Sequence, residues 1–242
     1  MSADNLKRVL LALLFIPLSA LGAGAALHLD TAPDVQGNQA ALQNGARLFV
    51  NYCLNCHGLS FVRYNRLTEL GLTEQQVKDN LMFTADKIGE PMRVAARGRE
   101  QKQWFGVTPP DLSLVARARA SAEGSGADWL YTYLRSFYRD EKRPTGWNNV
   151  LFNNVGMPHV LWELQGQQEL NHETQALGLV QSGRLAPEEF DRQVADLVGF
   201  LVWAGEPAAG LRKQLGIGVL VFLAILFGVA YALKKEYWKD VR

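Results

Sequence analysis

The sequence predicts a mainly α-helical domain that is anchored to a membrane by one C-terminal transmembrane helix. Apolar residues recur at helical spacing in the segments 39–52 and 187–205. Residues 215–233 form an uncharged apolar run about as long as a bilayer-spanning helix requires. A length of 242 residues suits one globular domain plus membrane segments, so we expect a domain at 26–210 and a transmembrane helix at 211–235.

Charge and composition exclude some classes of protein. The formal net charge is +1 and no long run of like charge occurs, so a nucleic-acid interface is not expected. The sequence contains neither a G-x-S-x-G elbow nor a P-loop, the motifs of independent hydrolytic or nucleotide chemistry. The 2 cysteines lie in one short motif, which leaves none for a structural disulfide elsewhere.

Residues 1–25 predict a signal peptide for export. Basic residues at 7–8, an apolar core at 9–18 and a small-residue cleavage site at 23–25 match the three parts of such a signal. The alternative is an uncleaved N-terminal anchor, because the uncharged run continues to Leu29 and is about long enough to span a bilayer. In either case the body of the chain is exported.

The chain is organised around Cys53, Cys56 and His57. Two cysteines three positions apart, followed at once by a histidine, form the attachment signature of a c-type haem. Each thiol adds across one porphyrin vinyl group, and the imidazole then reaches the iron from the same side. A zinc site would need further soft ligands that the chain lacks, and a Cys53–Cys56 disulfide would leave His57 unexplained. We therefore predict one covalently bound haem c, with His57 as an axial ligand.

A rigid turn at Pro109 and Pro110 is expected to orient this histidine. Proline keeps a carbonyl but has no N–H, and an axial histidine usually gives its second N–H to such an acceptor, which fixes the ring. Arg117 and Arg119 follow the turn and are candidates for pairing a haem propionate, because a guanidinium group presents a fork of donors. The alternative for all four residues is a purely structural role.

The second axial ligand is expected to be Met157. Gly156 and Pro158 frame it in a loop that is rigid and has room for a flat ring. A thioether ligand raises the reduction potential, which suits a carrier late in an electron-transfer chain. His159 is the rival, and bis-histidine ligation would lower the potential. The other candidates are Met82, Met92 and His172.

Further helix signals frame the domain. A capping box is expected at 73–76, at the start of a helix. Pro187 opens a helix whose apolar face is expected to cross the first helix at Gly45 and Phe49, and this crossing would clamp the haem-bearing segment. The basic residues at 93–102 predict a solvated face, with a docking site as the alternative.

The C-terminal anchor determines the orientation of the chain. Basic residues flank the apolar run at both ends, with more of them on its carboxyl side. Because the body is exported, we expect residues 236–242 to form a short cytoplasmic tail. The sequence thus predicts a single-pass protein of the cell inner membrane, with its haem domain on the periplasmic side and its anchor in the lipid bilayer.

Several motifs follow one another along nearly the whole chain. They are CLNCH at 53–57, PPDLS at 109–113, RAR at 117–119, PTG at 144–146, GMP at 156–158, VGFLVWAGEP at 198–207 and the terminal anchor. In this order they resemble the cytochrome c1 family, although the segment between the first two motifs matches it poorly. The resemblance implies a cytochrome c-type haem domain with inserted loops. It also implies a covalent haem on Cys53 and Cys56, iron ligation by His57 and Met157, and a propionate partner in Arg117.

The resemblance also implies a function and partners. The chain would be the cytochrome c subunit of a ubiquinol–cytochrome c reductase, in a dimeric membrane complex with cytochrome b and a Rieske iron–sulfur protein. It would accept single electrons from the Rieske protein and pass them to a cytochrome c, with no independent catalysis. One alternative is the cytochrome c subunit of a terminal oxidase or a nitric oxide reductase. Another is a haem enzyme or gas sensor with an open sixth iron position.

Overall fold

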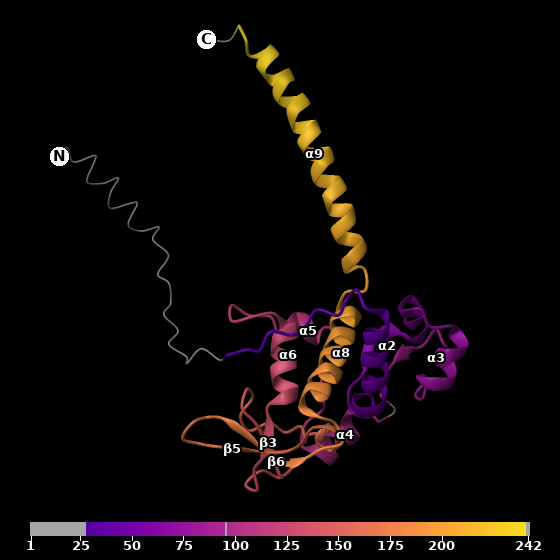
Figure 1. Cartoon of the computed structure of the whole chain (residues 1–242). Helices are drawn as coiled ribbons and strands as arrows, with labels where there is room; N and C mark the ends of the chain where they lie inside the picture. Colours follow the sequence, from indigo (N-terminus) through magenta and orange to yellow (C-terminus); the bar gives the residue numbers. More distant parts are fainter. Residues whose placement is uncertain (1–27, 95, 241–242) are drawn as a thin grey trace, which may run out of the picture.

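The computed structural model describes residues 28–94 and 96–240. The predicted signal peptide at 1–25 lies outside these residues. Within them the fold is mainly α-helical, as predicted, with a helical body and one long C-terminal helix that rises away from it (Figure 1). The helices of the body are α2 (Gln39–Leu48), α3 (Glu74–Asn80), α4 (Gly98–Phe105), α5 (Val115–Ala118), α6 (Gly126–Arg135), α7 (Trp162–Gln165) and α8 (Pro187–Gly205).

Short irregular helices and small sheets complete the body. A π-helical turn, η1 (Phe49–Cys53), continues α2, and a 3-10 helix, η2 (Tyr64–Leu70), precedes α3. The described residues form three two-stranded antiparallel sheets. Their strands are β1 (Leu59–Arg63) with β2 (Pro91–Met92), β3 (Phe137–Arg139) with β4 (Trp147–Asn149), and β5 (Gly166–Leu170) with β6 (Leu177–Ser182). The β5–β6 hairpin lies at the end of the body opposite the C-terminal helix (Figure 1).

The crossing of α2 and α8 is the centre of the body and agrees with the prediction. Gly45 lies so close to α8 that a Cβ added there would be 2.1 Å from the Asp196 carbonyl oxygen. One turn further along, the rings of Phe49 and Phe200 have centroids 5.7 Å apart. Both rings are fully buried. Because η1 continues α2 directly, this crossing fixes the segment that carries Cys53 and Cys56.

The local helix signals are confirmed at two helix starts. Thr73 and Gln76 form a reciprocal capping box at the N-terminus of α3. Pro187 is the first residue of α8, where its missing N–H costs nothing. The basic side chains at 93–102 are exposed and α4 begins among them, as a solvated face requires.

The apolar-rich segment 129–137 predicts a helix throughout, and the structure corrects this expectation. The apolar segment 129–137 is not helical throughout, because α6 ends at Arg135 and Phe137 begins β3. The polar segment 166–183 forms the β5–β6 hairpin. Its ends close on Gly166, whose φ is +99° and where a Cβ would lie 2.1 Å from a carbonyl oxygen of β6. The mostly polar strands give no period-2 apolar signal, which is why the sequence does not reveal the hairpin.

The C-terminal helix α9 (Ala209–Tyr237) is 29 residues long. It includes the predicted span 211–235, and it is long and apolar enough to cross a membrane. Its large apolar side chains are exposed along its whole length. A helix that is apolar on all sides and touches no core needs a lipid environment, so α9 is a membrane anchor.

Candidate haem site

The cysteine motif lies on a tight turn at the end of η1. The carbonyl oxygen of Cys53 accepts hydrogen bonds from the backbone N–H groups of Cys56 and His57, at 3.0 and 2.8 Å. Both cysteines are free thiols. Burial, followed by the neighbouring Cys56, raises the pKa of Cys53 to about 12, and burial also raises the pKa of Cys56. The turn therefore presents two protonated thiols and one imidazole within five residues.

The imidazole of His57 is held by the proline turn. Its Nδ1 lies 2.7 Å from the carbonyl oxygen of Pro110. A carbonyl only accepts, so Nδ1 carries the proton and Nε2 keeps a free lone pair. Burial lowers the pKa of His57, although the Pro110 carbonyl and the Asp111 carboxylate oppose this shift. The neutral ring thus has one nitrogen engaged and the other available to a metal.

The proline turn is itself fixed to the motif by the residues that follow it. The carboxylate of Asp111 accepts hydrogen bonds from the backbone N–H of Ser60, at 2.8 Å, and of Ser113, at 2.9 Å. The backbone N–H of Leu112 donates to the Gly58 carbonyl at 2.8 Å. These contacts tie the turn to the start of β1, so the Pro110 carbonyl has little freedom to move away from His57.

Gln101 is a residue of this site that sequence reasoning missed. Its side chain is buried in α4, with 3% of its surface exposed. The amide Nε2 donates to the carbonyl oxygen of Cys56 at 3.0 Å. A glutamine inside a basic helix carries no sequence signal for this role. It nevertheless satisfies a backbone acceptor in the middle of the cysteine motif.

The two candidate arginines have different surroundings. Arg117 donates through Nη1 to the carboxylate of Glu206, which also accepts from Arg212 at 2.6 Å. Arg117 therefore links α5 to the end of α8 and to the foot of α9. The guanidinium of Arg119 instead lies over the ring of Trp129, 4.2 Å from its centroid. The propionate contact of Arg117 stays a prediction, and Arg119 points toward α6.

Met157 lies half-buried in the loop after β4. Its Sδ is 3.5 Å from the hydroxyl of Tyr133, which donates to it. The thioether also packs against a small apolar cluster formed by Phe137, Trp147 and Val155. Burial raises the pKa of Tyr133 above its usual value, although the charge of Arg119 opposes the shift. Sequence reasoning did not identify Tyr133, because an aromatic residue in a helix most often packs in a core.

His159, the rival of Met157, is buried in the same cluster. Its ring stacks on Phe137 with centroids 4.9 Å apart and meets the edge of Trp147 at 5.0 Å. Burial lowers the pKa of His159 to about 4, although the side chain of Gln165 opposes the shift, so the ring is neutral. Its Nε2 has no hydrogen-bond partner among residues 28–94 and 96–240. The ring is therefore chemically able to bind a metal but is enclosed by aromatic side chains on two sides.

The donor set and its surroundings fit a c-type haem. Two free thiols, an imidazole with one nitrogen engaged and a thioether are the groups that such a cofactor uses. Two large apolar side chains in the segments that follow the proline turn and β4 are exposed, Leu114 at 45% and Phe152 at 43%. Leu114 follows the proline turn and Phe152 faces Arg119. Exposed apolar surface of this kind suits a flat apolar macrocycle.

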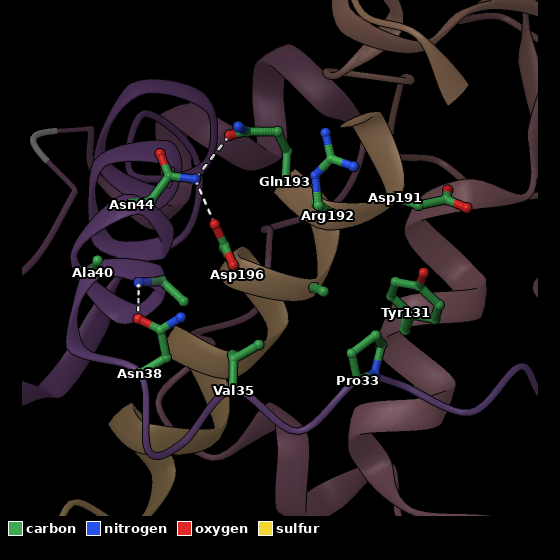
Figure 2. A pocket seen from close by; sticks show the side chains of 12 residues that line it. Pro33, Val35, Asn38, Ala40, Asn44, Tyr131, Asp191, Arg192, Gln193 and Asp196 are labelled. Atoms are coloured by element: carbon green, nitrogen blue, oxygen red, sulfur yellow. Dashed lines mark hydrogen bonds between the residues drawn. The ribbon is translucent and has the colours of Figure 1, made fainter. Parts of the chain in front are cut away.

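A separate cavity lies where the lead-in to α2 meets α8 (Figure 2). Its volume is about 540 Å³. Asn44 projects over it and donates to Gln193 at 2.9 Å and to Asp196 at 2.7 Å. Burial raises the pKa of Asp196, although Asn44 and Arg192 oppose the shift. None of the predicted haem residues lines this cavity, so it is distinct from the candidate haem site.

Comparison with known proteins gives one family and several full-length relatives. The sequence model of the Cytochrome C1 family matches residues 35–101 and 82–241. A protein of Nitrosomonas europaea named ammonia monooxygenase gamma subunit is 48% identical over 236 residues, which are 98% of both chains. Cytochrome c1 of Allochromatium vinosum is 46% identical over 98% of this chain and 100% of its own. Cytochrome c1 of Rhodospirillum rubrum is 30% identical over 85% of this chain and 83% of its own.

Proposed function

The chain belongs to the cytochrome c1 family, and we propose that it is the haem subunit of a ubiquinol–cytochrome c reductase. In this role it accepts single electrons from a Rieske iron–sulfur protein and passes them to a cytochrome c. The observation that carries the proposal is the 2.7 Å contact between His57 Nδ1 and the Pro110 carbonyl, which leaves Nε2 free to bind a metal. The free thiols of Cys53 and Cys56 lie on the same turn.

The proposed ligand arrangement combines these contacts with the expected role of Met157. One haem would be held by Cys53 and Cys56 through thioether bonds, and His57 Nε2 and Met157 Sδ would bind its iron. When bound, the haem supplies one-electron chemistry through Fe(II) and Fe(III). The chain supports both ligands: Pro110 orients the imidazole, and the thioether packs against the apolar cluster of Phe137, Trp147 and Val155. Fixed ligands need little rearrangement when the charge on the iron changes.

Two arginines can neutralise the propionates. We retain Arg117 as a propionate partner, and its other donors remain available beside the contact with Glu206. Arg119 is the second candidate, because its guanidinium lies on Trp129, next to the Tyr133 that contacts Met157. A guanidinium keeps its charge at all relevant pH values, which suits the binding of carboxylates.

The orientation in the membrane is part of the proposal. The haem domain, residues 26–210, lies on the periplasmic side of the cell inner membrane, and residues 236–242 form the cytoplasmic tail. Residues 1–25 direct export. The anchor packs in the bilayer beside cytochrome b, within a dimeric complex that also contains the Rieske protein. The exposed apolar surface of α9 supports an intramembrane partner or lipid contact.

Membership of a different complex is the second candidate. The Nitrosomonas europaea relative is about as similar to this chain as the cytochrome c1 of Allochromatium vinosum, but its name assigns it to ammonia monooxygenase. Purification of the tagged full chain from native membranes, followed by identification of its partners, separates the two. Cytochrome b and a Rieske protein support the proposal. Subunits of a monooxygenase, a haem–copper oxidase or a nitric oxide reductase would overturn it.

An absorption spectrum separates an electron carrier from a haem enzyme or gas sensor. With both axial positions filled by His57 and Met157, carbon monoxide added to the reduced native protein should leave the spectrum unchanged. A rapid shift would mean that the sixth position is open. In that case Met157 is not an iron ligand and the electron-transfer proposal fails.

A further inference from the structure

We infer that Tyr133 is a positioning residue for the sulfur of Met157, through a hydrogen bond that remains when the thioether binds iron. This inference rests on the proposed axial role of Met157. The hydroxyl of Tyr133 lies 3.5 Å from Sδ, within the range for a hydrogen bond to sulfur. A thioether sulfur has two lone pairs, so it can accept this bond with one and bind a metal with the other.

The phenol is held rigidly in its position. The ring of Tyr133 stacks on that of Trp129, with centroids 4.8 Å apart and planes 13° from parallel. The ring of Tyr133 also makes an edge contact with Phe137, with centroids 5.2 Å apart and planes at 69°. The guanidinium of Arg119 lies over the ring of Trp129, 4.2 Å from its centroid. Contacts with two aromatic neighbours restrict the ring and so restrict where its hydroxyl can point.

The backbone ties the same residue to the methionine loop. The side-chain amide of Asn149 donates to the carbonyl oxygen of Tyr133 at 2.8 Å. The Oδ1 of Asn149 accepts from the backbone N–H groups of Leu151 and Phe152, at 2.9 and 3.0 Å, at the start of the loop that leads to Met157. Helix α6 therefore holds this loop at two points, once through the Tyr133 carbonyl and once through its hydroxyl.

A hydrogen bond to a ligand sulfur has two effects on the metal. It draws electron density from the sulfur, which weakens donation to Fe(III) more than to Fe(II) and so raises the reduction potential. The hydrogen bond also occupies one lone pair of the sulfur, so only the other lone pair is available to the iron. Methionine has three rotatable bonds and otherwise orders poorly. Tyr133 thus both tunes and orders the proposed ligand.

The test compares Tyr133→Phe with Tyr131→Phe in the full-length holoprotein. Tyr131 is a matched control: it lies on the same helix, is 7% exposed, and contacts the guanidinium of Arg135 instead of Met157. Phenylalanine keeps the ring and removes only the hydroxyl. For Tyr133→Phe we expect a lower midpoint potential and a shifted sulfur-to-Fe(III) charge-transfer band, with the haem still covalent. Tyr131→Phe should leave both unchanged. Wild-type values for Tyr133→Phe would overturn the inference.

Met157→Leu distinguishes this inference from the proposed axial ligation. If Met157 is the ligand, Met157→Leu abolishes the charge-transfer band and lowers the potential, and adding Tyr133→Phe causes no further shift. If Met157→Leu leaves band and potential unchanged, the axial role of Met157 fails and the inference falls with it. If Met157→Leu acts as expected but Tyr133→Phe does not, only the role of Tyr133 is wrong. A further shift by Tyr133→Phe in the Met157→Leu background would also overturn it, since the tyrosine would then act without the sulfur.

Discussion

Replacing Gly45 with alanine tests whether the α2–α8 crossing holds the cysteine motif in place. The added Cβ would lie 2.1 Å from the Asp196 carbonyl oxygen and 2.7 Å from the Cβ of Phe200. Because unbonded heavy atoms settle at about 3.5 Å or more, the Asp196 carbonyl would have to move about 1.4 Å from the new Cβ, which requires the two helices to separate. Since one obstacle is backbone, no side-chain rotation removes the collision.

The size of the effect follows from two opposing terms. Overpacking a close-packed interior typically costs about 1–3 kcal/mol, and the backbone collision at Gly45 places this substitution at the upper end. Alanine is favoured over glycine inside a helix by about 1 kcal/mol. We therefore expect Gly45→Ala to lower the free energy of unfolding by about 2 kcal/mol.

The assay is chemical denaturation of the detergent-solubilised full chain, followed by far-ultraviolet circular dichroism. Gly210→Ala is the control, because Gly210 also lies in a helix but has no atom within 4 Å of its added Cβ. Its unfolding midpoint should match the wild type or rise slightly. The reasoning is refuted if Gly45→Ala is as stable as Gly210→Ala, since α2 and α8 would then accommodate a Cβ at position 45 without cost.

Three further predictions concern the site and its supports. Gln101→Leu leaves the carbonyl of Cys56 without its 3.0 Å donor, at a cost of about 1–3 kcal/mol, and should reduce covalent haem per chain on a haem-stained gel; full loading would contradict it. Asp128→Asn should flatten the acid side of the stability profile: burial raises the pKa of Asp128, but hydrogen bonds from Ser125 and Ala32 outweigh this and lower it. The contribution of Asp128 to the free energy of unfolding is therefore complete above the ordinary aspartate pKa of about 4 and is lost as the pH falls through the lowered value. Unfolding of the wild type and of Asp128→Asn measured below about pH 4 checks this, and the same pH dependence in both proteins would count against it. Met157→Leu should lower the midpoint potential, measured by potentiometric titration, while the haem stays covalent. An unaltered potential would mean that Met157 is not the iron ligand and would favour His159.

Local spacing was sufficient for several features of this protein. The cysteine motif at 53–57, the capping box at Thr73 and the start of α8 at Pro187 each depend on residues within a few positions of one another. The anchor depends only on the length and polarity of one run. The crossing at Gly45 was also predictable, because a glycine inside an apolar helix face most often marks a close approach.

Contacts between distant segments could not be read in this way. The acceptor for His57 is Pro110, 53 positions away, whereas the sequence indicated only one of two prolines. The partner of Arg117 is Glu206, 89 positions away, and nothing in the spacing connects them. The β5–β6 hairpin has no apolar alternation to reveal it.

The sequence by itself therefore determined which groups could bind a haem and that the chain is anchored by a C-terminal helix. Only the tertiary structure decided which neighbours orient those groups: Pro110 for His57, Gln101 for the Cys56 carbonyl and Tyr133 for Met157. The physical reason is that a side chain's chemistry and the local helix signals depend only on residues that are close together in the sequence. Which groups form a hydrogen bond across the fold depends instead on how whole helices pack against one another.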